Sequence, residues 1–182
     1  MRERPTGRKL PNERHKRRKD EKAMRRPKRQ MTDVGEIAGV LRECMVCRVG
    51  MSSQGKIYVV PMNFGYEQEG EKLTFYLHSA KVGRKIEAFR EEPEVCVELD
   101  CRHGLMEAEL PCSHSYYYAS LIGTGKVQVL KTYEEKLEGL KKLMRHQTGK
   151  DFDNFDEKWV GAVEVLKVEL DEYACKYHDG TN

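Results

Sequence analysis

The feature that most limits the fold is a pair of β-forming runs separated by a tight-turn signal. "KIYVVPMNFGYE" and "KLTFYLHS" are rich in β-branched and aromatic residues, and "QEGE" stands between them. They predict two antiparallel strands that lie side by side. Further runs, "EVCVEL", residues 113–130 and "GAVEVLKVEL", add strands, without the strand–helix–strand rhythm of a parallel sheet. We therefore predict a mainly β protein, a closed or nearly closed β-barrel with helical additions.

Three helices are expected around this barrel. The first begins near Thr32, because Asp33 and Glu36 have the spacing of a capping box and apolar residues follow at helical spacing. The second runs from about residue 82 to 90. The third is the amphipathic "TYEEKLEGLKKLMRHQ", whose His146 would be a cation that suits the helix dipole. Residues 101–112 are expected to form a loop, and Trp159 to pack beneath the C-terminal strand.

Charge divides the chain into a tail and a domain. Residues 1–30 hold 14 Lys or Arg and 4 acidic residues, whereas residues 31–182 hold 19 and 26. We predict that residues 1–30 form a disordered basic tail, because they contain almost no large apolar residues, and that residues 31–182 form one domain. The tail would be an arm for anionic partners, a solvated extension, or, for residues 1–23, a product of a start codon upstream of Met24. No aromatic residues interleave with its charges, which disfavours nucleic acid.

The sequence favours a cytoplasmic protein without a membrane span. It has no apolar stretch of about 18 residues and no apolar core of a signal peptide near its start. Its six cysteines are therefore expected to be reduced thiols rather than a disulfide framework.

A polar cluster stands where the second strand ends and a helix begins. His78 and Ser79 close the strand, and Arg84 and Lys85 follow Gly83 at the helix start. A hydroxyl, helix-start amides and two cations are what a phosphate requires. The same residues would also suit an exposed helix face and an ordinary strand-end histidine.

The neighbouring strand offers backbone groups beside this cluster. Pro61 donates no ladder hydrogen bond, so amides and carbonyls near Pro61 to Asn63 are left partly unpaired. They could read the edge of a flat, polar heterocycle. A small barrel is filled by its own side chains, so a large ligand would lie outside it, in a groove between two barrels.

Three motifs, in order and spacing, carry a resemblance that covers about residues 24–168. They are "PMNFG", "LHSA" with Gly83 and Lys85 after it, and "SLIGTG". The chain resembles the nitroimidazole-resistance (Nim-type) branch of the pyridoxamine 5′-phosphate oxidase-like, FMN-binding split β-barrels. It departs from the family pattern at Leu77, where phenylalanine is usual, and at His114, where tryptophan is frequent.

The resemblance implies a homodimer with two flavin sites at its interface. The cofactor would be FMN, with FAD as the alternative. The residues implied are the backbone of Val60, Pro61, Met62 and Asn63 for the ring, His78 or Ser79 with Arg84 and Lys85 for the phosphate, and Tyr117 to Ser120 of the second subunit.

The implied activity is a reductase that passes electrons from NAD(P)H to a small aromatic acceptor such as a nitroimidazole. His78 is the candidate proton donor, and a purely structural or phosphate-side histidine is its alternative. A non-enzymatic flavin or haem binder and a pyridoxamine-phosphate oxidase are rival functions. The C-terminus "ELDEYACKYHDGTN" is acidic and lacks the tryptophan of true vitamin oxidases, which disfavours the latter.

Two cysteine constellations have metal-ligand chemistry. Cys44 and Cys47 form a single C-x-x-C, which is a weak signal, and buried thiols are the preferred interpretation. Cys101, His103, Cys112 and His114 bracket one loop, but their spacing is not a common zinc pattern. We predict no metal site.

Overall fold

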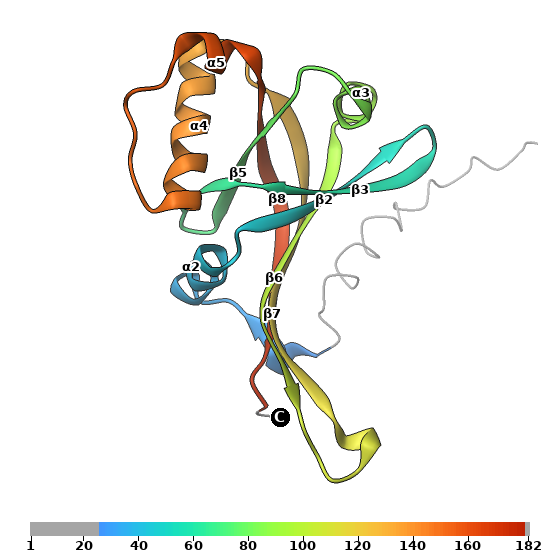
Figure 1. Ribbon diagram of the computed structural model, residues 1–182. Coiled ribbons are helices and arrows are strands. Elements are labelled where there is room, and N and C mark those ends of the chain that lie inside the picture. The colour runs from blue at the N-terminus through green and yellow to red at the C-terminus, as the bar shows by residue number, and fades with distance from the viewer. Residues whose placement is uncertain (1–25, 181–182) are drawn as a thin grey trace, which may run out of the picture.

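The computed structural model describes residues 26–180, in which one antiparallel sheet dominates (Figure 1). The sheet runs in the order β3-β2-β6-β7-β8-β5-β4, and β1 is added to β8. The strands of this order are β3 (Lys56–Asn63), β2 (Val46–Ser53), β6 (Glu94–Met106), β7 (Ser115–Val129), β8 (Glu164–His178), β5 (Lys72–Ser79) and β4 (Gly65–Glu69), with β1 (Gln30–Met31).

The two ends of this sheet meet and form a split barrel. β3 and β4 lie at opposite ends of the strand order, yet only Phe64 separates them in the chain, and β3 contacts β5. The predicted mainly β barrel is therefore confirmed. The predicted run from Lys56 to Glu67 is interrupted at Phe64, whose fully buried ring packs 5.2 Å from that of Phe75.

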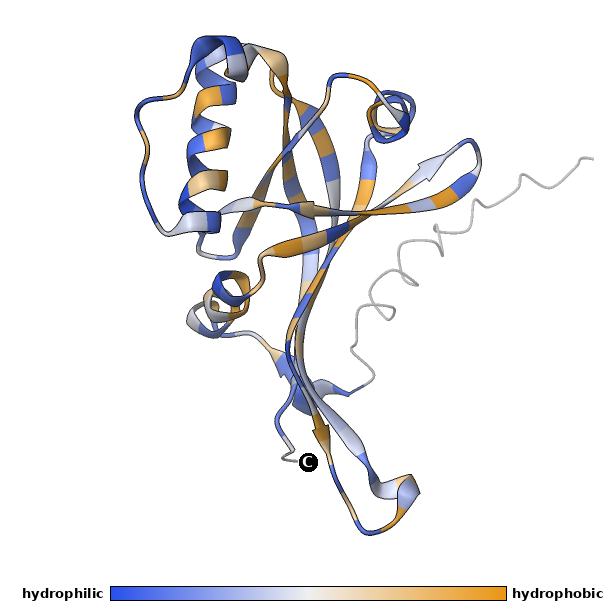
Figure 2. Cartoon of the chain, in the orientation of Figure 1, coloured by the Kyte–Doolittle hydropathy of each residue, from blue (hydrophilic) through white to orange (hydrophobic). Residues whose placement is uncertain are grey.

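Alternation of apolar and polar residues places the core inside the curled sheet (Figure 2). β7 shows the simple pattern, with Leu121 and Val127 buried and Ile122 exposed. β5 differs, since both of its faces are buried: Phe75 faces the barrel and Tyr76 lies under a helix. This double cover makes β5 a rigid support for the residues at its end.

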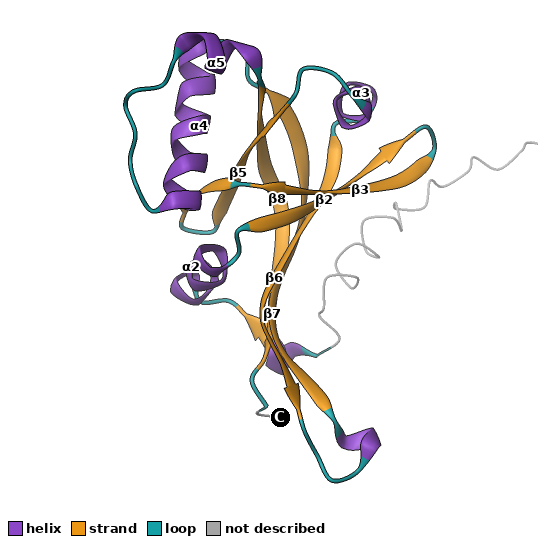
Figure 3. Cartoon of the chain, in the orientation of Figure 1, coloured by secondary structure: helices purple, strands orange, loops and turns teal. Residues whose placement is uncertain are grey.

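Helices lie at the margins of the sheet (Figure 3). The longest is α4 (Tyr133–Thr148), which covers β4 and β5. At Gly65 a Cβ would stand 2.3 Å from the backbone nitrogen of Leu143, so only glycine permits this close approach. The others are α2 (Val34–Glu43), α3 (Arg84–Glu91), α5 (Glu157–Ala162) and the 3-10 turns η1 (Pro27–Arg29) and η2 (Pro111–Ser113).

The first predicted helix is confirmed in α2. The Asp33 carboxylate accepts a hydrogen bond from the amide of Glu36 at 2.9 Å, and Ile37, Val40 and Leu41 are buried. None of the helices among residues 26–180 is long and apolar enough to cross a lipid bilayer.

Two expectations about the second half of the chain are wrong. Residues 101–106 continue β6 instead of forming a loop, so β6 and β7 make a long hairpin arm with its turn near η2 (Figure 1). A register shift between Cys101 and Gly104 keeps the pairing going past the bulge at Arg102. Trp159 does not pack beneath β8, because its side chain is 68% exposed.

The last residues of the predicted tail are part of the described structure. Residues 27–29 form η1, and Gln30 pairs with Lys176 in β8. The Arg29 guanidinium donates a hydrogen bond to Nε2 of His178 at 2.8 Å. The rest of the predicted tail, up to residue 25, lies outside the described residues.

Candidate functional site

The split of the barrel is a seam between β3 and the segment that follows β5. Two contacts fix its ends. Gly65 pairs with Tyr76 at one end, and the Arg84 guanidinium lies 4.0 Å from the centre of the Tyr58 ring at the other. The residues between these anchors, 59–63 on one side and 78–83 on the other, therefore face each other along the seam. The structure thus brings the two predicted halves of the site together.

The helix start beside the seam is an anion-binding arrangement. The Ser79 side chain is 4% exposed, and its Oγ is the buried side-chain oxygen that lacks a hydrogen-bond partner within the described residues. Four residues later Gly83 caps α3 with φ of 122°, a conformation that favours glycine. No side chain caps this helix, so its first amides are open to an anion.

The two cations at this helix start are held differently. Arg84 Nε donates a hydrogen bond to Ser53 Oγ at 3.0 Å, and its guanidinium stacks on Tyr58. These contacts tie α3 to the β2–β3 hairpin and fix the direction of the guanidinium. Lys85 is half-buried. The Arg84 guanidinium is thus fixed at one end of the seam.

On the β3 side, the strand offers an open backbone edge. β3 is an end strand of the sheet, so one edge of its backbone is not used by β2. Pro61 is exposed, Val60 is half-buried, and Met62 is buried with its carbonyl accepting from Cys47 Sγ at 3.6 Å.

The Asn63 side chain is engaged in an amide clamp. Its Nδ2 donates to Oε1 of Gln147 at 3.0 Å, and Gln147 Nε2 donates in turn to the carbonyls of Met45 and Phe64. This clamp fixes the end of β3 against α4. The backbone of Asn63 and its Oδ1 take no part in this clamp.

His78 and Ser79 point to opposite faces of β5, as neighbours in a strand do. His78 is exposed, opposite Val165 of β8, whereas Ser79 is buried. The exposed His78 ring is accessible from solvent.

Tyr117 and Ser120 do not reach the seam of their own chain. Ser120 pairs with Lys176 of β8, whereas His78 pairs with Val165, eleven residues earlier on the same strand. Eleven residues of extended chain span about 36 Å, but the β3 side of the seam is nearer: Ser120 also pairs with Asp100 of β6, and only β2 lies between β6 and β3. The Tyr117 ring instead lies over Gly104 in the hairpin arm.

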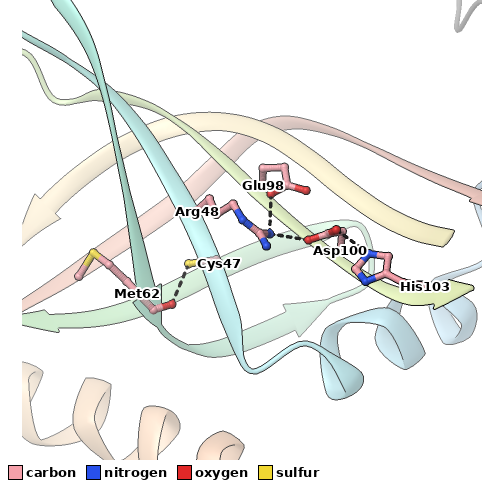
Figure 4. Close-up of polar contacts among 6 residues, drawn as sticks. All are labelled: Cys47, Arg48, Met62, Glu98, Asp100 and His103. Atoms are coloured by element: carbon pink, nitrogen blue, oxygen red, sulfur yellow. Dashed lines mark hydrogen bonds and ion pairs between the residues drawn. The ribbon is translucent and has the colours of Figure 1, made fainter.

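A network of charged side chains, which the sequence did not reveal, lies on the outer face of the sheet (Figure 4). Arg48 binds Glu98 at 3.0 Å and also binds Asp100, whose other oxygen lies 2.6 Å from His103 Nε2. Arg102, with φ of 61°, turns the bulge so that its guanidinium pairs with Glu43. The cluster depends on register between strands far apart in sequence, and no local pattern signals that.

Exposed apolar residues lie beside this ion-pair network, on the same face of the sheet. Gly50 pairs with Val59 and with Cys96, and two residues away Arg48 pairs with Pro61 and with Glu98. Side chains two residues apart in a strand share a face. The first row across the sheet is therefore Val59–Gly50–Cys96, and the second, beside it on the same face, is Pro61–Arg48–Glu98. Ile57, 89% exposed, lies further along β3, and Ile122 continues the second row on β7.

Comparison with known proteins identifies the fold and the family. The family model described as pyridoxamine 5′-phosphate oxidase matches residues 33–176. The chain belongs to the pyridoxamine 5′-phosphate oxidase family. All of the candidate residues lie inside the matched range, and the resemblance expected from the sequence motifs is confirmed.

Three solved structures resemble the chain over most of its length. A protein from Bacteroides thetaiotaomicron, provisionally described as a 5-nitroimidazole antibiotic resistance protein, is 35% identical, with a TM-score of 0.70 over 81% of this chain and 86% of that one. The flavocytochrome Anf3 from Azotobacter vinelandii is 20% identical, with a TM-score of 0.71 over 87% of this chain and 73% of its own. The FAD and haem binding protein from Mycobacterium smegmatis is 19% identical, with a TM-score of 0.68 over 84% and 74%. The last two support the fold alone. No curated protein matches the chain.

The four residues of the Cys101–His114 constellation do not converge, although Cys101 contacts Cys44 of the other constellation. Cys101 pairs with Ala119 near the base of the hairpin arm, whereas Cys112 lies in η2 at its tip. Within residues 26–180 no group of three or more His, Cys, Asp or Glu side chains is arranged to hold a metal ion. Cys44 and Cys47 are both buried, and burial raises the pKa of each thiol.

Proposed function

We propose that this protein is an FMN-dependent reductase that passes electrons from NAD(P)H to small aromatic acceptors such as nitroimidazoles. The observation that carries the proposal is the unpaired hydroxyl of Ser79 beside the uncapped start of α3. A buried hydroxyl without a partner costs free energy in the free protein, and a phosphate oxygen would remove that cost. The 35% identity to the Bacteroides protein supports the choice of acceptor.

The residues at the seam fit a flavin phosphate and ring. Ser79 would donate to the phosphate, and Arg84 and Lys85 would offset its charge. Ser53 and Tyr58 hold the Arg84 guanidinium in place, so less conformational entropy is lost on binding. The open backbone edge of β3 would orient the ring.

The bound flavin would supply hydride and electron transfer, which no side chain can perform. The chain would contribute position and a proton. His78 is exposed at the mouth of the seam, so its ring could give a proton to an acceptor as that acceptor gains electrons.

A homodimer would complete this site. Tyr117 and Ser120 lie on β7, which two strands separate from β3 of the same chain, so in this proposal they contact the flavin of a partner copy. The exposed apolar rows with Ile57 and Ile122 offer a surface that a second copy would cover. The substitution Ile57→Asp should produce monomers in light scattering, and a monomeric parent protein would contradict the dimer.

The absorption spectrum of the purified protein tests the proposal. We expect flavin bands, bleaching on addition of NAD(P)H, and recovery with a nitroaromatic compound. Mass analysis of the extracted cofactor distinguishes FMN from FAD. Flavin that NAD(P)H does not reduce would refute the reductase, and a Soret band would favour the haem-binding alternative.

Lys85→Glu separates the phosphate assignment from folding. The variant should lose flavin while its circular dichroism and melting temperature stay close to those of the parent. The same substitution at Arg90, an exposed cation at the far end of α3, is the matched control and should retain flavin. Full flavin retention by Lys85→Glu would show that the phosphate lies elsewhere.

A further inference from the structure

A second cleft lies outside the seam, between α2, β4 and the C-terminal end of α4. Figure 1 shows α2 near that end of α4, and residues of both helices line the cleft. The cleft has a volume of about 550 Å³, in the range of small-molecule sites. None of the seam residues lines it. The residues that matter for its chemistry are Arg42, Tyr66, Lys142, Arg145 and His146.

The cleft has an excess of positive charge. Its lining contains one carboxylate, Glu67, which already accepts hydrogen bonds from Lys142 at 2.6 Å and from the Tyr76 hydroxyl at 3.1 Å. The hydrogen bond from Lys142 lowers the pKa of Glu67, so this carboxyl and Lys142 offset each other at neutral pH. Two guanidinium groups, those of Arg42 and Arg145, remain.

These two guanidinium groups are available to an anion. Arg42 forms no hydrogen bond or ion pair to another residue among residues 26–180, although its charge helps to lower the pKa of the neighbouring Glu43. Arg145 Nε lies 3.6 Å from Asp151 Oδ1, and both side chains are almost three-quarters exposed. Exposed pairs of this kind contribute little free energy, so Arg145 can exchange its partner easily.

The cleft also contains an aromatic floor. The Tyr66 and His146 rings meet edge to face at 5.0 Å, and Phe64 lies 4.6 Å beneath His146. His146 Nε2 donates to the Cys44 carbonyl at 2.8 Å, and burial lowers the pKa of His146. The imidazole is therefore neutral at pH 7 and adds a flat surface rather than a charge. The two ring planes stand at 77° to each other, so a flat ligand could stack on one of these rings and not on both.

Compensation of helix dipoles alone does not account for the arrangement. Arg42 and Arg145 stand in the last turns of α2 and α4, where a cation stabilises a helix. That role requires no shared cleft and no aromatic floor. We propose that the cleft binds a nucleotide, with its phosphates at Arg42 and Arg145 and its base against Tyr66.

Calorimetric titration of ADP into the full-length protein tests this assignment. The titration is also made with the Lys85→Glu variant, which lacks the cation that a phosphate at the seam would need. ADP that binds to this variant therefore binds in the cleft. We expect Arg42→Ala and Arg145→Ala each to weaken ADP binding about tenfold or more, since each removes a charged hydrogen-bond donor. Binding should also weaken as salt rises. Arg90→Ala, which removes a last-turn arginine from α3, is the control and should leave the affinity unchanged.

Three results would overturn the assignment. The first is no heat of binding with millimolar ADP in the parent protein. The second is that Arg42→Ala and Arg145→Ala bind ADP as tightly as the parent but melt at a lower temperature. Both arginines would then only stabilise the ends of their helices. The third is pyrophosphate binding as tightly as ADP, which would remove the base from the site.

Discussion

Ser79 allows the proposed phosphate site to be tested by two effects of opposite sign. Its hydroxyl is 4% exposed and has no partner, so the free protein bears the cost of a desolvated polar group. That cost is about 1–3 kcal/mol. Ser79→Ala removes the group and leaves almost no cavity, so the apoprotein should become more stable by up to that amount.

The same substitution should weaken flavin binding. A hydrogen bond to a charged phosphate oxygen contributes about 1.5–3 kcal/mol, so FMN affinity should fall roughly tenfold to a hundredfold. Part of this loss arises because the free Ser79→Ala protein no longer bears the cost of an unpaired hydroxyl, so flavin binding has no such cost to remove. The stability gain and the affinity loss are therefore coupled.

The two effects need separate measurements on cofactor-free protein. Urea denaturation gives the free energy of unfolding, and quenching of flavin fluorescence gives the dissociation constant. Ser113→Ala, at an exposed serine in the arm, is the control and should change neither. If Ser79→Ala stabilised the apoprotein but bound FMN as well as the parent, the hydroxyl would have no role in the site. A loss of stability would mean that Ser79 already has a partner in the free protein.

Further predictions concern packing and pH. Gly65→Ala should lower the free energy of unfolding by about 1–3 kcal/mol, because its methyl group would collide with the α4 backbone at Leu143; an unchanged denaturation midpoint would refute the close approach. Burial lowers the pKa of His146, so the unfolded chain binds its proton more readily. The contribution of neutral His146 to the free energy of unfolding is therefore fully present above about pH 6.5, the pKa of an unfolded histidine. It is lost as the pH falls through the lower pKa that His146 has in the folded protein. His146→Gln should flatten this part of the stability profile, and equal slopes in both proteins would contradict it. Arg84→Lys should weaken flavin retention, because lysine cannot both stack on Tyr58 and donate to Ser53 as the guanidinium does; unchanged retention would count against that role.

The helix starts and turns that depend on residues close together in the sequence could be predicted from it. Asp33 and Glu36 mark the start of α2 because a cap involves residues three apart. The turn before β5 and the helix after Gly83 likewise depend on neighbouring residues. The halves of the site were therefore predictable, and the family motifs linked them.

Contacts between distant residues could not be predicted in the same way. The Asn63–Gln147 clamp joins residues 84 apart, so the motif gave no sign that the asparagine side chain is engaged. The hairpin arm was missed because residues 101–106 extend β6 only through pairing with β7. Trp159 was expected to pack beneath the C-terminal strand, but its side chain is 68% exposed, and nothing in the sequence around it reveals whether a surface exists to cover it. His146 was expected to be a cation, but Phe64 and Tyr66 surround it and burial favours the neutral form.

The position of the seam follows from proline in an end strand. A barrel closes when its last strands exchange backbone hydrogen bonds, and Pro61 has no amide hydrogen to give. β3 contacts β5 but pairs only with β2 in the described sheet, so a backbone edge stays open beside His78 and the start of α3. An open edge with exposed apolar neighbours such as Ile57 would invite unwanted pairing unless something covers it. A flat ring along the edge, with a second copy of the chain over the adjacent rows, would cover both, which is why flavin binding and dimer formation belong to one proposal.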